Sequence, residues 1–169
     1  MNRQPIYNII VFYKKIYSMK KILLICFILL VFLKINAQQK KVLFIGNSYT
    51  GVNNLPLLVK NIALSLGDTM FVDSNTPGGY TLNLHSTNAT TQAKINSQQW
   101  DYVVLQEQSQ IPSLPQSITV TDYSIPHSVT LNNKIKSNFS CTETVFYMTW
   151  GRKNGDASFC GQHPPVCTY

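Results

Sequence analysis

The chain has 169 residues and a formal net charge of +7, a length that suits one domain with a hydrophobic core. Residues 1–37 carry six basic side chains and no acidic one, whereas the sequence from Gln38 onward has eight basic and seven acidic residues. A nucleic-acid-binding domain keeps its basic excess on the folded part of the chain. The charge distribution therefore excludes nucleic acid as the expected partner.

Residues 19–37 have the pattern of a secretory signal peptide. A short cationic start precedes an apolar run over residues 22–33, and Ala37 provides a small residue for cleavage. The run is shorter than the roughly 20 residues of a membrane-spanning helix, although an uncleaved anchor is the alternative. We expect an exported protein, periplasmic or extracellular, that meets the membrane only through this peptide. Residues 1–18 are expected to be an upstream extension without function.

The sequence after the leader alternates between short apolar runs and helical patterns. We expect four buried strands: Lys41–Ile45, Thr69–Val72, Asp101–Leu105 and Thr144–Met148. We expect helices over Leu55–Leu66, over about His85–Ile95, and within Gln116–Asn138. This alternation is typical of βαβ units, so the predicted fold class is α/β, with a parallel sheet and helices on both faces.

Each predicted strand is followed by a polar or glycine-rich loop. The four loops contain Gly46–Ser48, Pro77–Gly79, Gln106–Gln108 and Thr149–Gly151. Ligands of parallel sheets bind at the carboxyl ends of the strands, and these loops are expected to converge there. Ser48 follows the first strand directly, where backbone N–H groups can hold a developing oxyanion. The alternative is that Ser48 caps a helix or ends a turn.

These blocks, in this order, resemble those of the SGNH (GDSL-like) ester hydrolases. Phe44–Tyr49 is similar to the block that carries the nucleophilic serine, with Asn47 where aspartate is commoner. Gly79 falls where the family has its oxyanion-hole glycine. Gln106–Gln108 stands where the family has an asparagine, and Thr149–Lys153 looks like a secreted bacterial branch.

The resemblance implies a flavodoxin-like three-layer α/β/α fold for residues 38–169 and a serine ester hydrolase. Ser48 would be the nucleophile, and the oxyanion hole would consist of Ser48, Gly79 and the amide of Gln106 (or Gln108). The implied substrates are small acyl or acetyl esters, on small molecules or carbohydrates, and no cofactor is expected.

The family's Asp-x-x-His block is missing from this sequence. The nearest imitation contains His163, which has Cys160 where the aspartate should be, so His163 is a weak candidate for the base. His85 is expected to have a packing or capping role. We therefore expect a hydrolase domain that is incomplete at the C-terminus, truncated and impaired in activity. The alternatives are a non-catalytic carbohydrate-binding module and an inactive fragment.

Three cysteines follow the leader. Cys160 and Cys167 lie close enough in sequence to close a small loop with a disulfide, which leaves Cys141 as an expected buried thiol. No metal site is predicted, because there is no Cys-x-x-Cys pair and no second histidine near these residues.

Overall fold

The computed structural model describes residues 15–21, 23–24, 38–150, 154–161 and 164–167. The chain divides into two units, Met1–Ala37 and Gln38–Tyr169. In the first unit residues 15–21 and 23–24 are helical, and most of the predicted extension and signal peptide lies outside the described residues. Within the described ranges, no helix combines the length and the hydrophobicity that a membrane span requires.

The second unit is built on a sheet of parallel strands. The strands are β1 (Lys40–Ile45), β2 (Met70–Asn75), β3 (Tyr102–Leu105) and β4 (Glu143–Phe146). Their order in the sheet is β2-β1-β3-β4, and all three pairings are parallel. The α/β fold class is therefore confirmed, with the strand order that the flavodoxin-like arrangement has over its first four strands.

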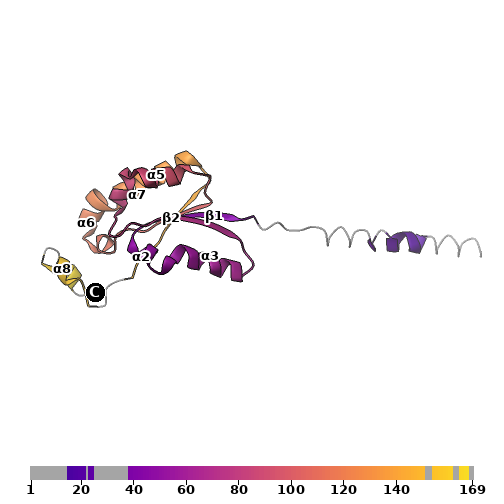
Figure 1. Ribbon diagram of the computed structural model, residues 1–169, viewed down its shortest axis with the longest axis horizontal. Helices are drawn as coiled ribbons and strands as arrows, with labels where there is room; N and C mark the ends of the chain where they lie inside the picture. The colour runs from indigo at the N-terminus through magenta and orange to yellow at the C-terminus, as the bar shows by residue number, and fades with distance from the viewer. Residues whose placement is uncertain (1–14, 22, 25–37, 151–153, 162–163, 168–169) are drawn as a thin grey trace, which may run out of the picture. The chain divides into compact units, whose positions relative to one another are not determined.

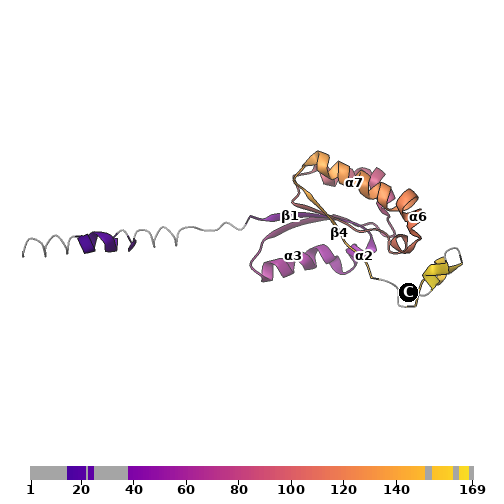
Figure 2. The ribbon, with the colours of Figure 1, turned by 180° about the vertical axis from the view of Figure 1, so that it is seen from behind.

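Helices cover both faces of this sheet, as Figure 1 and the opposite view in Figure 2 show, with α3 on one face and α5 and α7 on the other. The α-helices are α2 (Ser48–Gly51), α3 (Leu55–Ser65), α4 (Leu82–Thr87), α5 (Ala89–Asn96), α6 (Gln116–Ile118), α7 (Ile125–Asn138) and α8 (Ala157–Cys160). Shorter turns are η1 (Val52–Asn54), η2 (Ile111–Ser113), the π-helical η3 (Thr119–Tyr123) and η4 (Pro164–Cys167).

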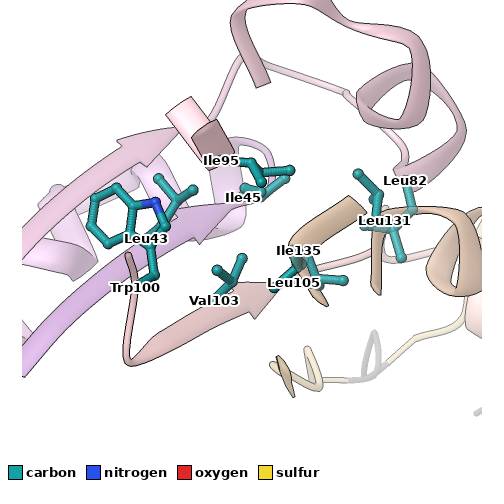
Figure 3. Close-up of a cluster of buried hydrophobic side chains, with 9 residues drawn as sticks. All are labelled: Leu43, Ile45, Leu82, Ile95, Trp100, Val103, Leu105, Leu131 and Ile135. Atoms are coloured by element: carbon teal, nitrogen blue, oxygen red, sulfur yellow. The ribbon is translucent and has the colours of Figure 1, made fainter. Parts of the chain in front are cut away.

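The hydrophobic core lies between the sheet and the layer that contains α4, α5 and α7. Side chains alternate along a strand, so Leu43 and Ile45 of β1 share one face, which packs in this core. Val42 and Phe44 point to the opposite face and are also buried. The complete cluster is Leu43, Ile45, Leu82, Ile95, Trp100, Val103, Leu105, Leu131 and Ile135 (Figure 3).

Strand β2 extends three residues beyond its predicted end. Asp73, Ser74 and Asn75 have low strand propensity, yet they pair with Leu43, Phe44 and Ile45 of β1. β2 lies at one edge of the sheet, where half-buried polar side chains are tolerated, and pairing with a buried strand outweighs local preference.

The two helical regions after β2 and β3 are each divided. Asn88 ends α4 and also caps α5, because its extended backbone interrupts the helix while its side chain accepts the Thr91 N–H. The segment within Gln116–Asn138 forms α6, the π-helical η3 and α7. Pro126 lies in the first turn of α7, where the missing N–H costs no hydrogen bond.

Apolar side chains remain exposed on the outer face of α3 and along β4. Leu58 and Ile62, which the helical spacing placed on the same face, are 51% and 52% exposed. β4 is an edge strand, and Phe146 within it is 59% exposed. An exposed apolar helix face and an apolar edge strand are surfaces on which further chain or a partner can pack.

The core predicts a large difference between two leucine truncations. Leu43→Ala removes a side chain with 0% exposure and should lower the free energy of unfolding by about 2–5 kcal/mol. Leu64→Ala, at a site with 60% exposure on α3, should change it by less than about 0.5 kcal/mol. Urea unfolding followed by circular dichroism measures both, and equal losses would contradict the assigned core.

Candidate active site

The turn after β1 presents Ser48 at the surface. Asn47 has an extended backbone and caps α2, and its Oδ1 accepts the Tyr49 N–H at 3.0 Å. Ser48 is the first residue of this short helix and is exposed, whereas Asn47 beside it is buried. The capping geometry thus fixes the backbone around Ser48 and leaves the side chain accessible.

Asn47 also connects this turn to the glycine loop, which we define as residues 77–81. Its Nδ2 donates to the Tyr80 carbonyl oxygen at 2.9 Å. Gly79, immediately before Tyr80, has φ of 71°, a conformation that side-chain-bearing residues rarely adopt. Ser48 and Gly79 therefore each lie one residue from the same hydrogen bond, although they are 31 positions apart in sequence.

Gln106 connects the turn to the loop after β3, a role that differs from the predicted one. Its Oε1 accepts the Asn47 N–H at 3.0 Å and the Thr50 hydroxyl at 2.9 Å, and its Nε2 donates to the Glu107 carbonyl. The side chain has 0% exposure. Gln106 therefore holds the loops together, and the structure does not present its amide to a ligand.

Gly46 is required by this close packing. A Cβ at position 46 would lie 2.7 Å from Oε1 of Gln106 and 2.8 Å from Oγ1 of Thr50. Both neighbours are fixed by the hydrogen bond between them. Any larger residue would have to displace the buried amide.

Gln108, the second candidate for the oxyanion hole, is also engaged. Its Nε2 donates to Oε1 of Gln110, and its own Oε1 accepts the Gln110 N–H at 2.7 Å. Gln110 in turn donates to Oδ2 of Asp156 at 2.5 Å. The predicted amide donor from Gln108 thus belongs to a chain of side-chain contacts that reaches the segment before α8.

Several backbone N–H groups in these loops have no hydrogen-bond acceptor within the part of the chain that the structure describes. They belong to Ser48, Gly78, Gly79 and Thr81, while the N–H groups of Tyr49 and Tyr80 both have acceptors. The Ser48 hydroxyl likewise forms no hydrogen bond with the described residues. Unpaired donors in two connected loops can bind an anion or an oxyanion.

His85 is buried beneath the turn and has both ring nitrogens occupied. Its Nε2 lies 2.8 Å from the Gly46 carbonyl oxygen, which only accepts, and its Nδ1 lies 2.8 Å from Oγ1 of Thr91. The neutral ring with its proton on Nε2 satisfies both contacts. Burial lowers the pKa of His85 from 6.5, against the opposing effect of the Gly46 carbonyl. The burial of His85 and its two contacts confirm the expected packing role.

Glu107 is a functional candidate that the sequence analysis missed. It is 8% exposed, and its Oε1 accepts the N–H groups of Leu82 at 3.0 Å and Gln108 at 2.7 Å. Burial raises the pKa of Glu107 above 4.5, whereas these two N–H groups, the Ser124 side chain and nearby His127 favour its ionised form. Its position between Gln106 and Gln108 in the sequence does not indicate that its side chain is buried and accepts two backbone N–H groups.

A cavity of about 250 Å³ opens at the carboxyl ends of β3 and β4. Polar groups of Glu107, Gln110 and Asp156 line it together with Tyr147 and Trp150. Trp150 is 62% exposed, and its ring centroid lies 4.7 Å from that of Tyr49, the neighbour of Ser48. The cavity thus adjoins the turn that carries the serine.

The cysteine residues differ partly from expectation. Cys160 and Cys167 form a disulfide with a Cα–Cα distance of 4.7 Å. Cys141 is exposed, not buried, because it lies in a surface turn while its neighbour Thr142 turns inward and donates to the Trp100 carbonyl.

His163 lies outside the described residues, so the structure gives no position for this candidate base. Among the residues that are described, no group of three or more histidine, cysteine, aspartate or glutamate side chains could hold a metal ion.

Comparison with known proteins identifies a similar fold. No protein-family model and no curated protein matches the sequence. The structure is similar to the crystal structure of a DUF4886 family protein from Bacteroides uniformis, with a TM-score of 0.59 and 19% sequence identity. The match covers 77% of this chain and 57% of the neighbour, so the chain spans little more than half the length of that protein. At this identity the likeness concerns the fold alone.

The environment of Gln106 predicts a marked loss of stability in Gln106→Met. Methionine has a similar length but no acceptor, so the buried Asn47 N–H and Thr50 hydroxyl lose their partner. Each loss should cost about 1–3 kcal/mol. Gln108→Met, at a half-exposed site, is the matched control and should cost less than about 1 kcal/mol. Equal effects in urea unfolding would argue against the linking role of Gln106.

The lowered pKa of His85 predicts a pH-dependent contribution to stability. Below pH 6.5 the unfolded chain binds a proton that the folded chain resists, so stability present above pH 6.5 is lost as pH falls through the folded pKa. The slope is at most about 1.4 kcal/mol per pH unit. The stability advantage of the native chain over His85→Gln should therefore shrink from pH 7 to pH 5 in urea unfolding. An advantage that grows on acidification would reverse the inferred sign.

Proposed function

We propose that this domain is a serine ester hydrolase of the SGNH type, with Ser48 as the nucleophile. The observation that carries the proposal is that an exposed serine lies in one of two connected loops whose backbone N–H groups include donors with no acceptor among the described residues. These donors include the N–H groups of Ser48 itself and of Gly79, in loops joined by the Asn47–Tyr80 hydrogen bond. Both loops follow strands of a parallel sheet at their carboxyl ends, where such sheets bind ligands.

The proposed chemistry is attack of the Ser48 hydroxyl oxygen on an ester carbonyl while a base takes its proton. The resulting tetrahedral intermediate expels the alcohol, which takes up that proton, and water then hydrolyses the acyl ester on Ser48. The tetrahedral intermediate carries a negative charge on the former carbonyl oxygen, and the N–H groups of Ser48 and Gly79 would stabilise it. Loss of one such donor typically raises the barrier by about 2.7–4 kcal/mol. Gln106 supports this arrangement indirectly, because it holds the Asn47 N–H. Small acyl esters, including esters on carbohydrates, are the proposed substrates.

We propose further that hydrolysis is slow in this chain. A serine hydroxyl is a weak nucleophile until a base accepts its proton, and no described side chain forms a hydrogen bond to it. His85 is committed to Gly46 and Thr91. The Ser48 side chain is exposed, so a small base from solution has access to it.

A binding module for carbohydrates is the second candidate function. The exposed indole of Trp150 and the polar groups in the adjoining cavity favour it, because an aromatic face and hydrogen-bonding side chains suit a sugar. In this alternative Ser48 is not activated. Reaction with a fluorophosphonate in the presence of imidazole separates the two functions, since only a serine that the added base can activate is labelled.

Added imidazole is expected to increase ester hydrolysis by the native chain through Ser48. With p-nitrophenyl acetate, the rate above that of Ser48→Ala should rise about tenfold, less than the roughly 10²–10⁴-fold that a positioned base supplies. Absorbance of p-nitrophenolate measures the rate, and Ser48→Ala corrects for hydrolysis by imidazole itself.

Ser65→Ala, an exposed serine on α3, is the matched control and should behave as the native chain does. Identical rates for the native chain and Ser48→Ala at every imidazole concentration, with no fluorophosphonate adduct on Ser48 by mass spectrometry, would rule out the nucleophile. Sugar-dependent quenching of tryptophan fluorescence in that case supports the binding module.

A further inference from the structure

Glu107 occupies an unusual environment for a carboxylate. Its side chain is more than nine-tenths buried, and one oxygen, Oε1, accepts two backbone N–H groups. The other oxygen, Oε2, is buried and has no hydrogen-bond partner among the described residues. Burying an acceptor without a donor costs stability, so the choice of glutamate is not explained by folding alone.

The two N–H groups that Oε1 accepts come from different loops. Gln108 belongs to the loop after β3, whereas Leu82 is the first residue of α4 and directly follows the glycine loop. Hydrogen bonds to an ionised acceptor are shorter and stronger than those between neutral groups. A single carboxylate oxygen therefore attaches the exit of the glycine loop to the loop after β3.

The glycine loop is fixed at two points on either side of Thr81. Asn47 holds the Tyr80 carbonyl, and Glu107 holds the Leu82 N–H. Apart from its chain neighbours, Gly79 has no heavy atom within 4 Å of the position its Cβ would occupy, so no packing contact on that side fixes it. The orientation of its N–H then depends on the turn closed by the Tyr80 N–H and the Pro77 carbonyl, and on the attachments that follow this turn.

We infer that Glu107 is the positioning residue of the glycine loop, and that it acts through Leu82 to keep the Gly79 N–H oriented for the oxyanion. This inference rests on the proposed function, because it assigns the Gly79 N–H to the site of Ser48. Glu107 itself does not contact the reacting atoms. A glutamine can replace it in this role, since the amide Oε1 still accepts both N–H groups.

The test compares Glu107→Gln with Glu107→Met in the full chain. Amide hydrogen exchange by NMR should show the Leu82 N–H exchanging about tenfold faster in Glu107→Met, because its acceptor is gone. The Gly79 amide resonance should shift in the same variant. Glu107→Gln should retain native exchange at Leu82 and the native Gly79 resonance. Glu143→Met, at an exposed glutamate of β4, is the control and should change neither.

A second readout uses the imidazole-assisted hydrolysis. Glu107→Met should lower kcat about tenfold with KM unchanged, and Glu107→Gln should restore it. If Glu107→Met does not fold, Glu107→Asp replaces it, since the shorter side chain keeps the charge but withdraws the acceptor from Leu82.

Native exchange at Leu82 and an unshifted Gly79 resonance in Glu107→Met, or failure of glutamine to restore them, overturns the inference. If the native chain shows no Ser48-dependent hydrolysis, the proposed function fails. The exchange and resonance data then still decide whether Glu107 positions the loop.

Discussion

The arrangement of the site depends on the hydrogen bonds of one buried residue, Asn47. Its backbone N–H is held by Gln106, its Oδ1 accepts the Tyr49 N–H, and its Nδ2 donates to the Tyr80 carbonyl. These three bonds reach the turn after β1, the loop after β2 and the loop after β3. An aspartate could accept from Tyr49 but could not donate to Tyr80. The amide is therefore suited to joining a donor in the turn, the Tyr49 N–H, to an acceptor in the glycine loop, the Tyr80 carbonyl.

Two neutral polar side chains hold the turn around Asn47 in place. Gln106 fills the space that Gly46 leaves open, and His85 donates to the Gly46 carbonyl. A charged imidazole at this depth would be costly, and burial accordingly lowers the pKa of His85. Glu107 is the exception, because it carries a carboxylate into the same region, and one of its oxygens has no hydrogen-bond partner among the described residues. A buried polar cluster of this kind loses much when any single partner is removed.

The parallel sheet explains why these residues meet. In the order β2-β1-β3-β4, the strands that carry the turn of Ser48 and the loop of Gln106 are neighbours. β1 is followed by a crossover to β2 on one side, and β3 lies on its other side, so the chain diverges at their carboxyl ends. Ligand sites of open α/β sheets form at such a point. The proposed hydrolase site thus occupies the position that the topology provides, whatever its substrate.

Most of the fold could be predicted from local patterns, because each strand contains a short apolar run and the segment that forms α3 has a helical pattern. The polar end of β2, the break at Asn88 and the exposure of Cys141 could not, since each depends on a neighbour distant in sequence.

The site shows the same division. The sequence by itself determined that Ser48 and Gly79 follow strands and that a glutamine-rich loop follows the third strand. Only the tertiary structure decided that Gln106 is fully engaged by the turn and that Glu107 is buried against Leu82. The physical reason is that strand pairing brings loops together, and the hydrogen bonds that a side chain forms there depend on groups 25 to 59 residues away.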